Sequence, residues 1–185
     1  NVDLDHQEYL GPAIKDIAFE KAGIIKKGVP LVSAADNKEA LSVISDRCSE
    51  AGTMLYLYGR EFYSSGDYPD NFTYHGIRGR HPSLASPLLG SHQMVNTSCA
   101  LAVVELLAEK GIDITDDNIR EGLRSVRWDG RLEVIQNDPL FILDGAHNRS
   151  GAAALARYLM SIKDGNRRLI LIVGVMKDKD IGSIL

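Results

Sequence analysis

Residues 1–28 read NVDLDHQEYLGPAIKDIAFEKAGIIKKG, and the rest of the predicted fold builds outward from this stretch. Pro12 suits the first position of a helix, and Gly23 suits the left-handed residue that ends one. Within the helix expected over residues 12–22, apolar side chains recur at three- and four-residue steps and form one buried face. Lys21 follows the same spacing, so we expect it to border that face.

Residue types alone leave two interpretations of Lys21. A desolvated lysine loses basicity, and its neutral amine can act as a nucleophile or add carbon dioxide to become an anionic carbamate. Alternatively, its aliphatic stem lies along apolar surface while the ammonium reaches water. His6, just before the helix, is likewise either a functional group or a satisfied structural histidine.

Composition narrows the classes of protein that fit. The chain has 185 residues, 44% of them hydrophobic, which is enough for one domain or two small ones. The net charge of −4 lies in short mixed runs, so nucleic acid is not an expected partner. Cys48 and Cys99 lack metal-type spacing, and we interpret them as buried thiols. Without a long apolar run or secretion signal, no membrane partner is expected, and we predict a cytoplasmic protein.

The segments after residue 28 predict an α/β fold. A strand is expected over residues 29–33, and a second strand over residues 54–57. Between them, Asp36 and Glu39 give the capping-box spacing for a helix that reaches about residue 51. A strand, a helix and a strand in this order indicate a parallel crossover.

The middle of the chain changes character. Short segments rich in Gly, Pro and Ser predict antiparallel strands over residues 72–77 and 84–89. The longest helix follows and begins with His92, Gln93 and Asn96. A helix start offers free N–H groups and a positive dipole end, so these side chains either simply open the helix or help to hold a ligand.

A domain boundary is expected where the helical pattern breaks at Trp128-Asp-Gly-Arg-Leu-Glu133, which divides the chain into residues 1–129 and 130–185. Glycine lets the backbone turn there while Arg131 projects. The guanidinium fork of arginine matches phosphate oxygens, although an arginine at a boundary can also serve as an ion pair.

The second part reads as a Rossmann-like crossover. We predict a strand buried on both faces over residues 140–143, a helix over residues 151–163 and another strand over residues 169–173. Asp144 and His147 follow the first strand, at the sheet edge where parallel sheets bind ligands. A Gly-x-Gly-x-x-Gly turn is lacking, so dinucleotide binding is disfavoured.

Five ordered motifs resemble the folylpolyglutamate synthase and dihydrofolate synthase family, which belongs to the Mur ligases. They are Asp5-His6, Phe-Glu-Lys21-Ala-Gly-Ile, Gly-x-His-Gln-x-x-Asn96, Trp-x-Gly-Arg131-Leu-Glu and Leu-Asp144-Gly-Ala-His147-Asn. The resemblance implies part of a Mur-ligase-type central ATPase domain over residues 1–129, followed by part of a Rossmann-like C-terminal domain over residues 130–185.

The same resemblance implies roles for six residues. They are His6 as a magnesium ligand, Lys21 as a catalytic carbamate, Asn96, Arg131 and Asp144 as ATP-binding residues, and His147 near the incoming glutamate. Thr97 stands where the family usually has alanine, and Arg149 where it often has proline. The family's phosphate loop, Gly-x-x-x-x-Gly-Lys followed by Ser or Thr, is absent. We therefore expect a fragment that is inactive on its own.

The implied function is an ATP-dependent ligase that uses magnesium and adds L-glutamate to reduced folate or dihydropteroate through an acyl phosphate. The full-length form would be a monomer. Two alternatives differ in class. A sister ligase that builds UDP-N-acetylmuramoyl peptides for the cell wall shares three of the motifs, although the Lys21 and Asp144 motifs fit the folate branch better. A non-catalytic nucleotide-binding module would retain the sheet and lose the charged site residues.

Overall fold

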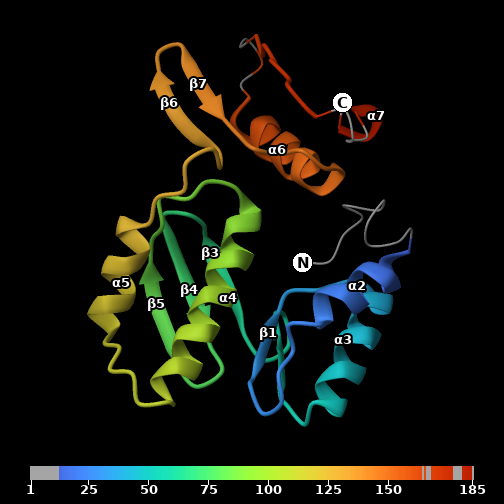
Figure 1. The fold of residues 1–185 in the computed structure, drawn as a ribbon. Helices are drawn as coiled ribbons and strands as arrows, with labels where there is room; N and C mark the ends of the chain where they lie inside the picture. Colours follow the sequence, from blue (N-terminus) through green and yellow to red (C-terminus); the bar gives the residue numbers. More distant parts are fainter. Residues whose placement is uncertain (1–12, 164, 166–167, 177–180, 185) are drawn as a thin grey trace.

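A computed structural model describes residues 13–163, 165, 168–176 and 181–184 (Figure 1). Its helices are α2 (Ile14–Ala22), α3 (Lys38–Glu50), α4 (Ser91–Ala108), α5 (Asp116–Ser125), α6 (Arg149–Ile162) and α7 (Ile181–Ile184). Its strands are β1 (Leu31–Ser33), β2 (Leu55–Leu57), β3 (Tyr63–Asp67), β4 (Asn71–His75), β5 (Arg80–Leu84), β6 (Glu133–Asn137) and β7 (Leu140–Leu143). The mixed α/β fold agrees with the prediction from sequence.

The first layer is the predicted parallel crossover. Strands β1 and β2 pair in parallel, with Leu31 opposite Leu55, and α3 connects them. Helices α2 and α3 lie side by side and pack on each other (Figure 1). Ile17 and Ala40 are fully buried between them, because the apolar positions of both helices recur at helical spacing.

Helix α2 ends at Ala22 as expected, but two details of the helix caps in this layer differ from the prediction. Gly23 ends α2 with φ −59°, which is right-handed backbone and not the left-handed conformation that its residue type favours. The cap of α3 is Asn37 and not Asp36: the Asn37 side chain accepts hydrogen bonds from the backbone N–H groups of Glu39 at 2.9 Å and Ala40 at 3.2 Å. Adjacent Asp and Asn residues cap almost equally well, so sequence alone does not choose between them.

The second layer is an antiparallel sheet in the order β3-β4-β5, covered by α4 (Figure 1). Its core contains Phe62, Phe72, Tyr74 and Leu84, each no more than 1% exposed. The predicted strand over residues 72–77 is confirmed in β4. The one over residues 84–89 is wrong, because β5 ends at Leu84. Strand β3 was not predicted, since it reads Tyr-Ser-Ser-Gly-Asp and lacks an apolar alternation.

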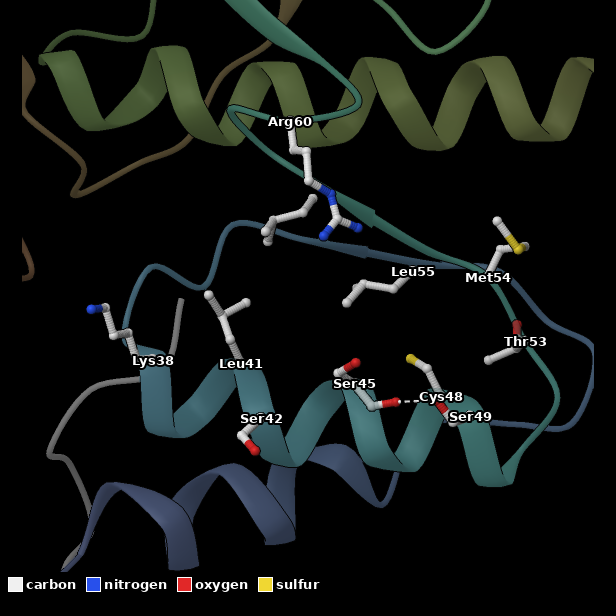
Figure 2. Close-up of a pocket in the computed structure, with 11 residues that line it drawn as sticks. Lys38, Leu41, Ser42, Ser45, Cys48, Ser49, Thr53, Met54, Leu55 and Arg60 are labelled. Atoms are coloured by element: carbon white, nitrogen blue, oxygen red, sulfur yellow. Dashed lines mark hydrogen bonds between the residues drawn. The ribbon is translucent and has the colours of Figure 1, made fainter.

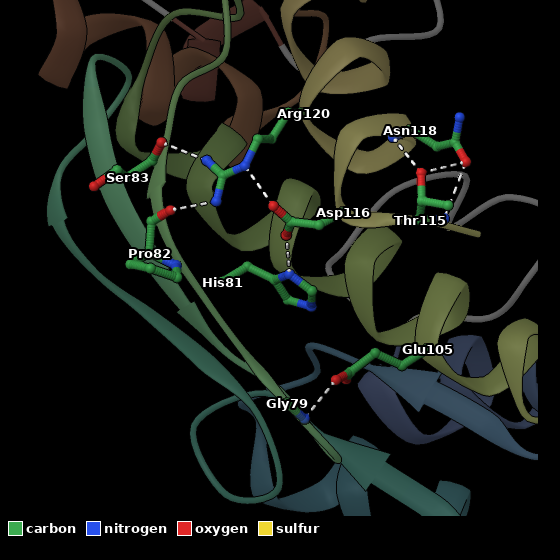
Figure 3. A network of polar contacts seen from close by, with 9 residues as sticks. All are labelled: Gly79, His81, Pro82, Ser83, Glu105, Thr115, Asp116, Asn118 and Arg120. Atoms are coloured by element: carbon green, nitrogen blue, oxygen red, sulfur yellow. Dashed lines mark hydrogen bonds and ion pairs between the residues drawn. The ribbon is translucent and has the colours of Figure 1, made fainter.

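Polar side chains connect helices α4 and α5 to this sheet (Figure 3). The Glu105 carboxylate on α4 accepts hydrogen bonds from Tyr74 Oη at 2.9 Å and from the backbone N–H of Gly79 at 2.9 Å. On α5, Asp116 lies 2.7 Å from His81 Nδ1 and accepts a hydrogen bond from Arg120 Nε at 2.6 Å. Arg120 also donates to the backbone oxygens of Ser83 at 2.9 Å and Pro82 at 3.0 Å, so Asp116 and Arg120 together connect α5 to β5.

The part after that boundary differs most from the prediction. Strand β7 pairs antiparallel with β6, and residues 168–176 contain no strand, so the predicted Rossmann-like crossover is absent from the described residues. Phe141 is 51% exposed and Ile172 is 84% exposed, so neither segment is buried on both faces. A continuous apolar run predicts a strand but does not say which neighbour it pairs with, and here the pairing is with the adjacent segment.

The helix after β7 is confirmed as α6, which is capped by Asn148 through a 2.9 Å hydrogen bond from the N–H of Gly151. Helix α6 contacts α4 and α7. In the described part of the chain, no helix combines the length and the apolar character that crossing a bilayer requires.

Candidate functional site

The candidate site is built around the hinge segment, residues 128–133, which joins α5 to β6. Gly130 has φ +68°, and Leu132 has φ +50°, which is uncommon for a residue with a side chain. The Glu133 carboxylate accepts a 2.7 Å hydrogen bond from the backbone N–H of Gly130. The Leu132 side chain is 2% exposed. A buried side chain and a charged acceptor therefore hold a strained turn in one conformation.

Arg131 lies between Gly130 and Leu132 in the hinge segment, and its side chain is half-buried. Its backbone N–H donates to Trp128 O at 3.3 Å, and its guanidinium carbon lies 5.7 Å from the centroid of the Trp128 ring. A Cβ added at Gly145 would lie 3.5 Å from Arg131 Nη1. The guanidinium thus lies between an aromatic face and the loop that follows β7.

Asp144 connects that loop to the hinge segment. The hairpin register places Glu133 opposite Leu143, so Leu132 and Asp144 meet just beyond the strand ends. Asp144 Oδ2 accepts from the N–H of Leu132 at 2.9 Å, and Oδ1 accepts from the N–H of Ala146 at 2.8 Å. One carboxylate therefore fixes both the hinge segment and the first turn of the loop.

The loop between β7 and α6 also carries His147. The N–H of Gly145 donates to Gly130 O at 2.7 Å, which is a second connection between loop and hinge segment. His147 Nδ1 lies 2.8 Å from Gly145 O, so the proton is assigned to Nδ1 because a carbonyl can only accept. The His147 side chain is exposed.

The start of α4 lies against the same segment. A Cβ added at Gly90 would lie 2.7 Å from His92 Cε1 and 2.8 Å from Leu132 Cδ1, so the His92 ring and the Leu132 side chain both lie close to this glycine. Burial lowers the pKa of His92; nearby Asp144 opposes this, whereas Arg157 and Arg131 add to it. These charged groups are therefore close enough to influence the His92 ring.

Asn96 lies one turn further along α4 than His92, and its side chain is exposed. Its Nδ2 donates to Gln93 Oε1 at 2.9 Å, and Gln93 itself is 2% exposed. A buried glutamine thereby orients an exposed amide. The structure thus brings Arg131, Asp144 and the loop of His147 together beside the α4 start that carries Asn96.

The remaining predicted site residues are not part of this arrangement in the described structure. Lys21 lies in the last turn of α2 next to the buried face of Ile17 and Ala18, and its side chain is exposed, which agrees with the interpretation in which the ammonium reaches water. Its neighbour Ala22 takes the buried position, at 4% exposure. His6 lies outside the described residues. Among the residues that are described, no three His, Cys, Asp or Glu side chains group closely enough to hold a metal ion, so they do not by themselves fit a magnesium site.

An open hollow of about 500 Å³ lies elsewhere, between α3 and β2 (Figure 2). Its lining includes Lys38, Cys48, Leu55 and Arg60. Arg60 is already paired with Glu61 at 2.6 Å, and burial raises the pKa of the Cys48 thiol. None of the predicted site residues lines this hollow, so the candidate site stays at the hinge segment.

Two residues in the arrangement, Trp128 and Glu133, are not among the expected site residues, and His92 is expected only as a possible ligand contact at the helix start. Trp128 and Glu133 flank Arg131 within the Trp-x-Gly-Arg-Leu-Glu motif, and His92 lies in the Gly-x-His-Gln motif. Their motif positions were the available signal. The contacts of Trp128 with Arg131 and of Glu133 with Gly130, and the position of His92 beside Gly90, depend on the fold.

Comparisons with known proteins identify relatives along the whole chain. The model of the Mur ligase glutamate ligase domain matches residues 130–185. Folylpolyglutamate synthase of Lacticaseibacillus casei is 34% identical over 188 residues, covering 99% of this chain and 44% of the relative. The dihydrofolate synthase/folylpolyglutamate synthase of Bacillus subtilis is 34% identical over 187 residues, covering 97% of this chain and 43% of the relative.

Solved structures of folylpolyglutamate synthases are also similar to this chain. A mutant of the L. casei folylpolyglutamate synthase superposes with a TM-score of 0.83 at 33% identity, covering 95% of this chain and 44% of that one. A complex of a folylpolyglutamate synthase with AMPPCP and folate has a TM-score of 0.83 at 35% identity, covering 88% of this chain and 41% of that one. This chain thus spans less than half the length of these relatives. On these similarities in sequence and structure, it belongs to the folylpolyglutamate synthase and dihydrofolate synthase family of the Mur ligases.

Proposed function

We propose that this chain forms part of an ATP-dependent ligase that adds L-glutamate to a folate. The observation that carries the proposal is similarity to folylpolyglutamate and dihydrofolate synthases over nearly the whole chain, 99% of it for the L. casei enzyme. In the reaction of such a ligase, ATP phosphorylates a carboxylate of the folate. The amine of L-glutamate then attacks the acyl phosphate, an amide forms, and ADP and phosphate leave.

ATP would bind beside the hinge segment. A relative has been solved with AMPPCP, an ATP analogue, which supports nucleotide binding in the family. The exposed Asn96 amide would donate to and accept from the adenine edge, because an amide offers both a donor and an acceptor. Arg131 would hold phosphate oxygens with its fork, and Asp144 would reach the nucleotide from the loop after β7.

His147 would act near the incoming glutamate. It lies on the same loop as Asp144 and is exposed. The Nδ1 proton, donated to Gly145 O, would hold the imidazole in one orientation on the loop. L-glutamate and reduced folate or dihydropteroate are the small-molecule substrates in this proposal.

Magnesium and the Lys21 carbamate rest on the family resemblance alone. His6 would be a metal ligand and the carbamate would supply hard oxygens, as magnesium prefers. The described residues do not by themselves form such a metal site. Incorporation of ¹³C-labelled bicarbonate at Lys21 in the complete enzyme, read by NMR, would test the carbamate; an unlabelled side chain would exclude it.

We also propose the division into a central ATPase part, residues 1–129, and a C-terminal part, residues 130–185. The match of the glutamate ligase domain to residues 130–185 supports this division, as does the backbone turn at Gly130. ATP would then lie between two domains. The monomeric state and the cytoplasmic location expected from sequence remain predictions.

Kinetics of an arginine variant test the proposal. In the complete protein, Arg131→Ala should lower glutamate-dependent ADP formation by on the order of a thousandfold, because arginines that stabilise transferring phosphate supply effects of this size. Arg127→Ala is the matched control, since Arg127 is an exposed arginine just before the hinge segment. An Arg131→Ala variant within threefold of the parent would show that Arg131 does not touch the transferring phosphate.

A further inference from the structure

We propose that Glu133 is the positioning residue for Arg131: its carboxylate holds the Gly130 N–H and thereby sets the direction in which the arginine projects. The consequence for nucleotide binding rests on the proposed function. The structural part concerns only the hinge segment and does not depend on it.

Arg131 lies between two backbone N–H groups that are each held by a carboxylate. The N–H of Gly130 donates to Glu133 Oε2 at 2.7 Å, and the N–H of Leu132 donates to Asp144 Oδ2 at 2.9 Å. Both donating residues have positive φ, at +68° and +50°. Glycine adopts this conformation freely, whereas at Leu132 it is strained and persists only where the surroundings over-determine it. The two carboxylates supply that constraint on either side of Arg131.

Glu133 is itself held in place. It is the first residue of β6, it pairs with Leu143 on β7, and its side chain is half-buried. A charged acceptor bonds a backbone N–H more strongly than a neutral one does. Asp144, by contrast, already has a place in the proposed nucleotide site. Glu133 therefore holds the hinge turn on the Gly130 side of Arg131, while Asp144 holds it on the Leu132 side.

The direction that this turn gives to Arg131 is visible in its contacts. The guanidinium lies over the Trp128 ring at 5.7 Å, and Gly145 lies on the loop beside it. The Gly130 O atom also accepts a hydrogen bond from the N–H of Gly145 at 2.7 Å, so the two peptide units that flank the Gly130 Cα are each held by a hydrogen bond. Loss of the Glu133 carboxylate would release the Gly130 N–H and let Arg131 leave Trp128.

The variants Glu133→Ala, Glu133→Gln, Arg131→Ala and the Glu133→Ala/Arg131→Ala double mutant test the proposal. Glutamine keeps a side-chain oxygen that can accept from Gly130, so it should preserve the position of Arg131. Glu121→Ala, which removes an exposed glutamate on α5, is the matched control.

The first readout needs no nucleotide. The 185-residue chain has one tryptophan, so its fluorescence emission, excited at a wavelength that tyrosine does not absorb, reports Trp128 alone. Glu133→Ala should change the emission in the same direction as Arg131→Ala, and Glu133→Gln and Glu121→Ala should leave it unchanged. If Glu133→Ala retains the parental emission while Arg131→Ala shifts it, Glu133 does not position Arg131. A parental emission in Arg131→Ala itself would show that the guanidinium does not lie on Trp128, which also overturns the proposal.

The second readout is the KM for ATP of the complete enzyme. Glu133→Ala should raise it about tenfold, as expected for loss of a bond to a charged acceptor, and Glu133→Gln should stay within about threefold. In the Arg131→Ala background the Glu133→Ala change should add almost nothing, because it acts through the arginine. Independent, additive losses would reduce Glu133 to a general structural role. If the parent enzyme does not use ATP, the proposed function fails, and the emission measurement still decides the role of Glu133.

Discussion

Replacement of Asp144 by alanine should destabilise the chain by about 2–3 kcal/mol, because this carboxylate connects the hinge segment to the loop after β7. It accepts two backbone hydrogen bonds, at 2.9 Å from Leu132 and at 2.8 Å from Ala146. Hydrogen bonds to a charged acceptor contribute about 1.5–3 kcal/mol each, so two of them sum to about 3–6 kcal/mol. Because Asp144 is only half-buried, water replaces part of what the bonds contribute, and a loss of about 2–3 kcal/mol is expected.

The measurement is urea unfolding of the 185-residue chain, followed by circular dichroism and by the emission of Trp128. Asp144→Asn should lose about half as much, because it keeps one oxygen acceptor. The control is Asp113→Ala, since Asp113 is exposed in the loop before α5. A loss below about 0.5 kcal/mol for Asp144→Ala, equal to that of the control, would refute the view that Asp144 holds the hinge segment.

Three further predictions concern other parts of the chain. Burial lowers the pKa of His92, so as the pH falls the unfolded chain binds this proton before the folded chain does; the contribution of His92 to stability is therefore present above pH about 6.5 and is lost as the pH falls through the lowered pKa. Urea unfolding between pH 8 and 5 should show a smaller loss of stability in His92→Gln than in the parent. An equal loss of stability in both proteins would contradict this prediction. Glu105→Ala leaves Tyr74 Oη and the N–H of Gly79 without their acceptor and should lower the free energy of unfolding by about 3 kcal/mol. In the same experiment, Glu109→Ala removes only an exposed ion pair and should lower it by less than about 1 kcal/mol. The 185-residue chain alone should not release ADP in a glutamate-dependent assay, since its sequence has no glycine-rich phosphate loop, and turnover at ordinary enzyme rates would show that another stretch holds the phosphates.

Helical spacing predicted more of the fold than strand patterns did. The buried faces of α2 and α3 follow from apolar residues at three- and four-residue steps, and Ile17 and Ala40 are indeed fully buried. Strands β3 and β6 are largely polar, so an apolar pattern could not find them. The run over residues 169–173 has the composition of a strand, but a strand also needs a partner, and the described structure provides none.

The candidate site was predictable in its residues and not in its connections. Motif positions singled out Arg131 and Asp144, but the 2.9 Å bond from Leu132 to Asp144 depends on the register of the β6–β7 hairpin. The bulge in that hairpin between Val134 and Gln136 is not visible in the sequence. For Lys21, helical spacing placed the residue beside the buried face but left open whether its side chain is buried, and the packing of α2 leaves it exposed.

The most direct test of the proposed function is mass spectrometry of the product formed by the complete protein from ATP, L-glutamate and reduced folate or dihydropteroate. The proposal predicts a product heavier by one glutamyl residue, with one ADP and one phosphate released for each amide formed. ATP hydrolysis without an amide product, or glutamyl transfer only to a UDP-linked cell-wall peptide, would contradict it.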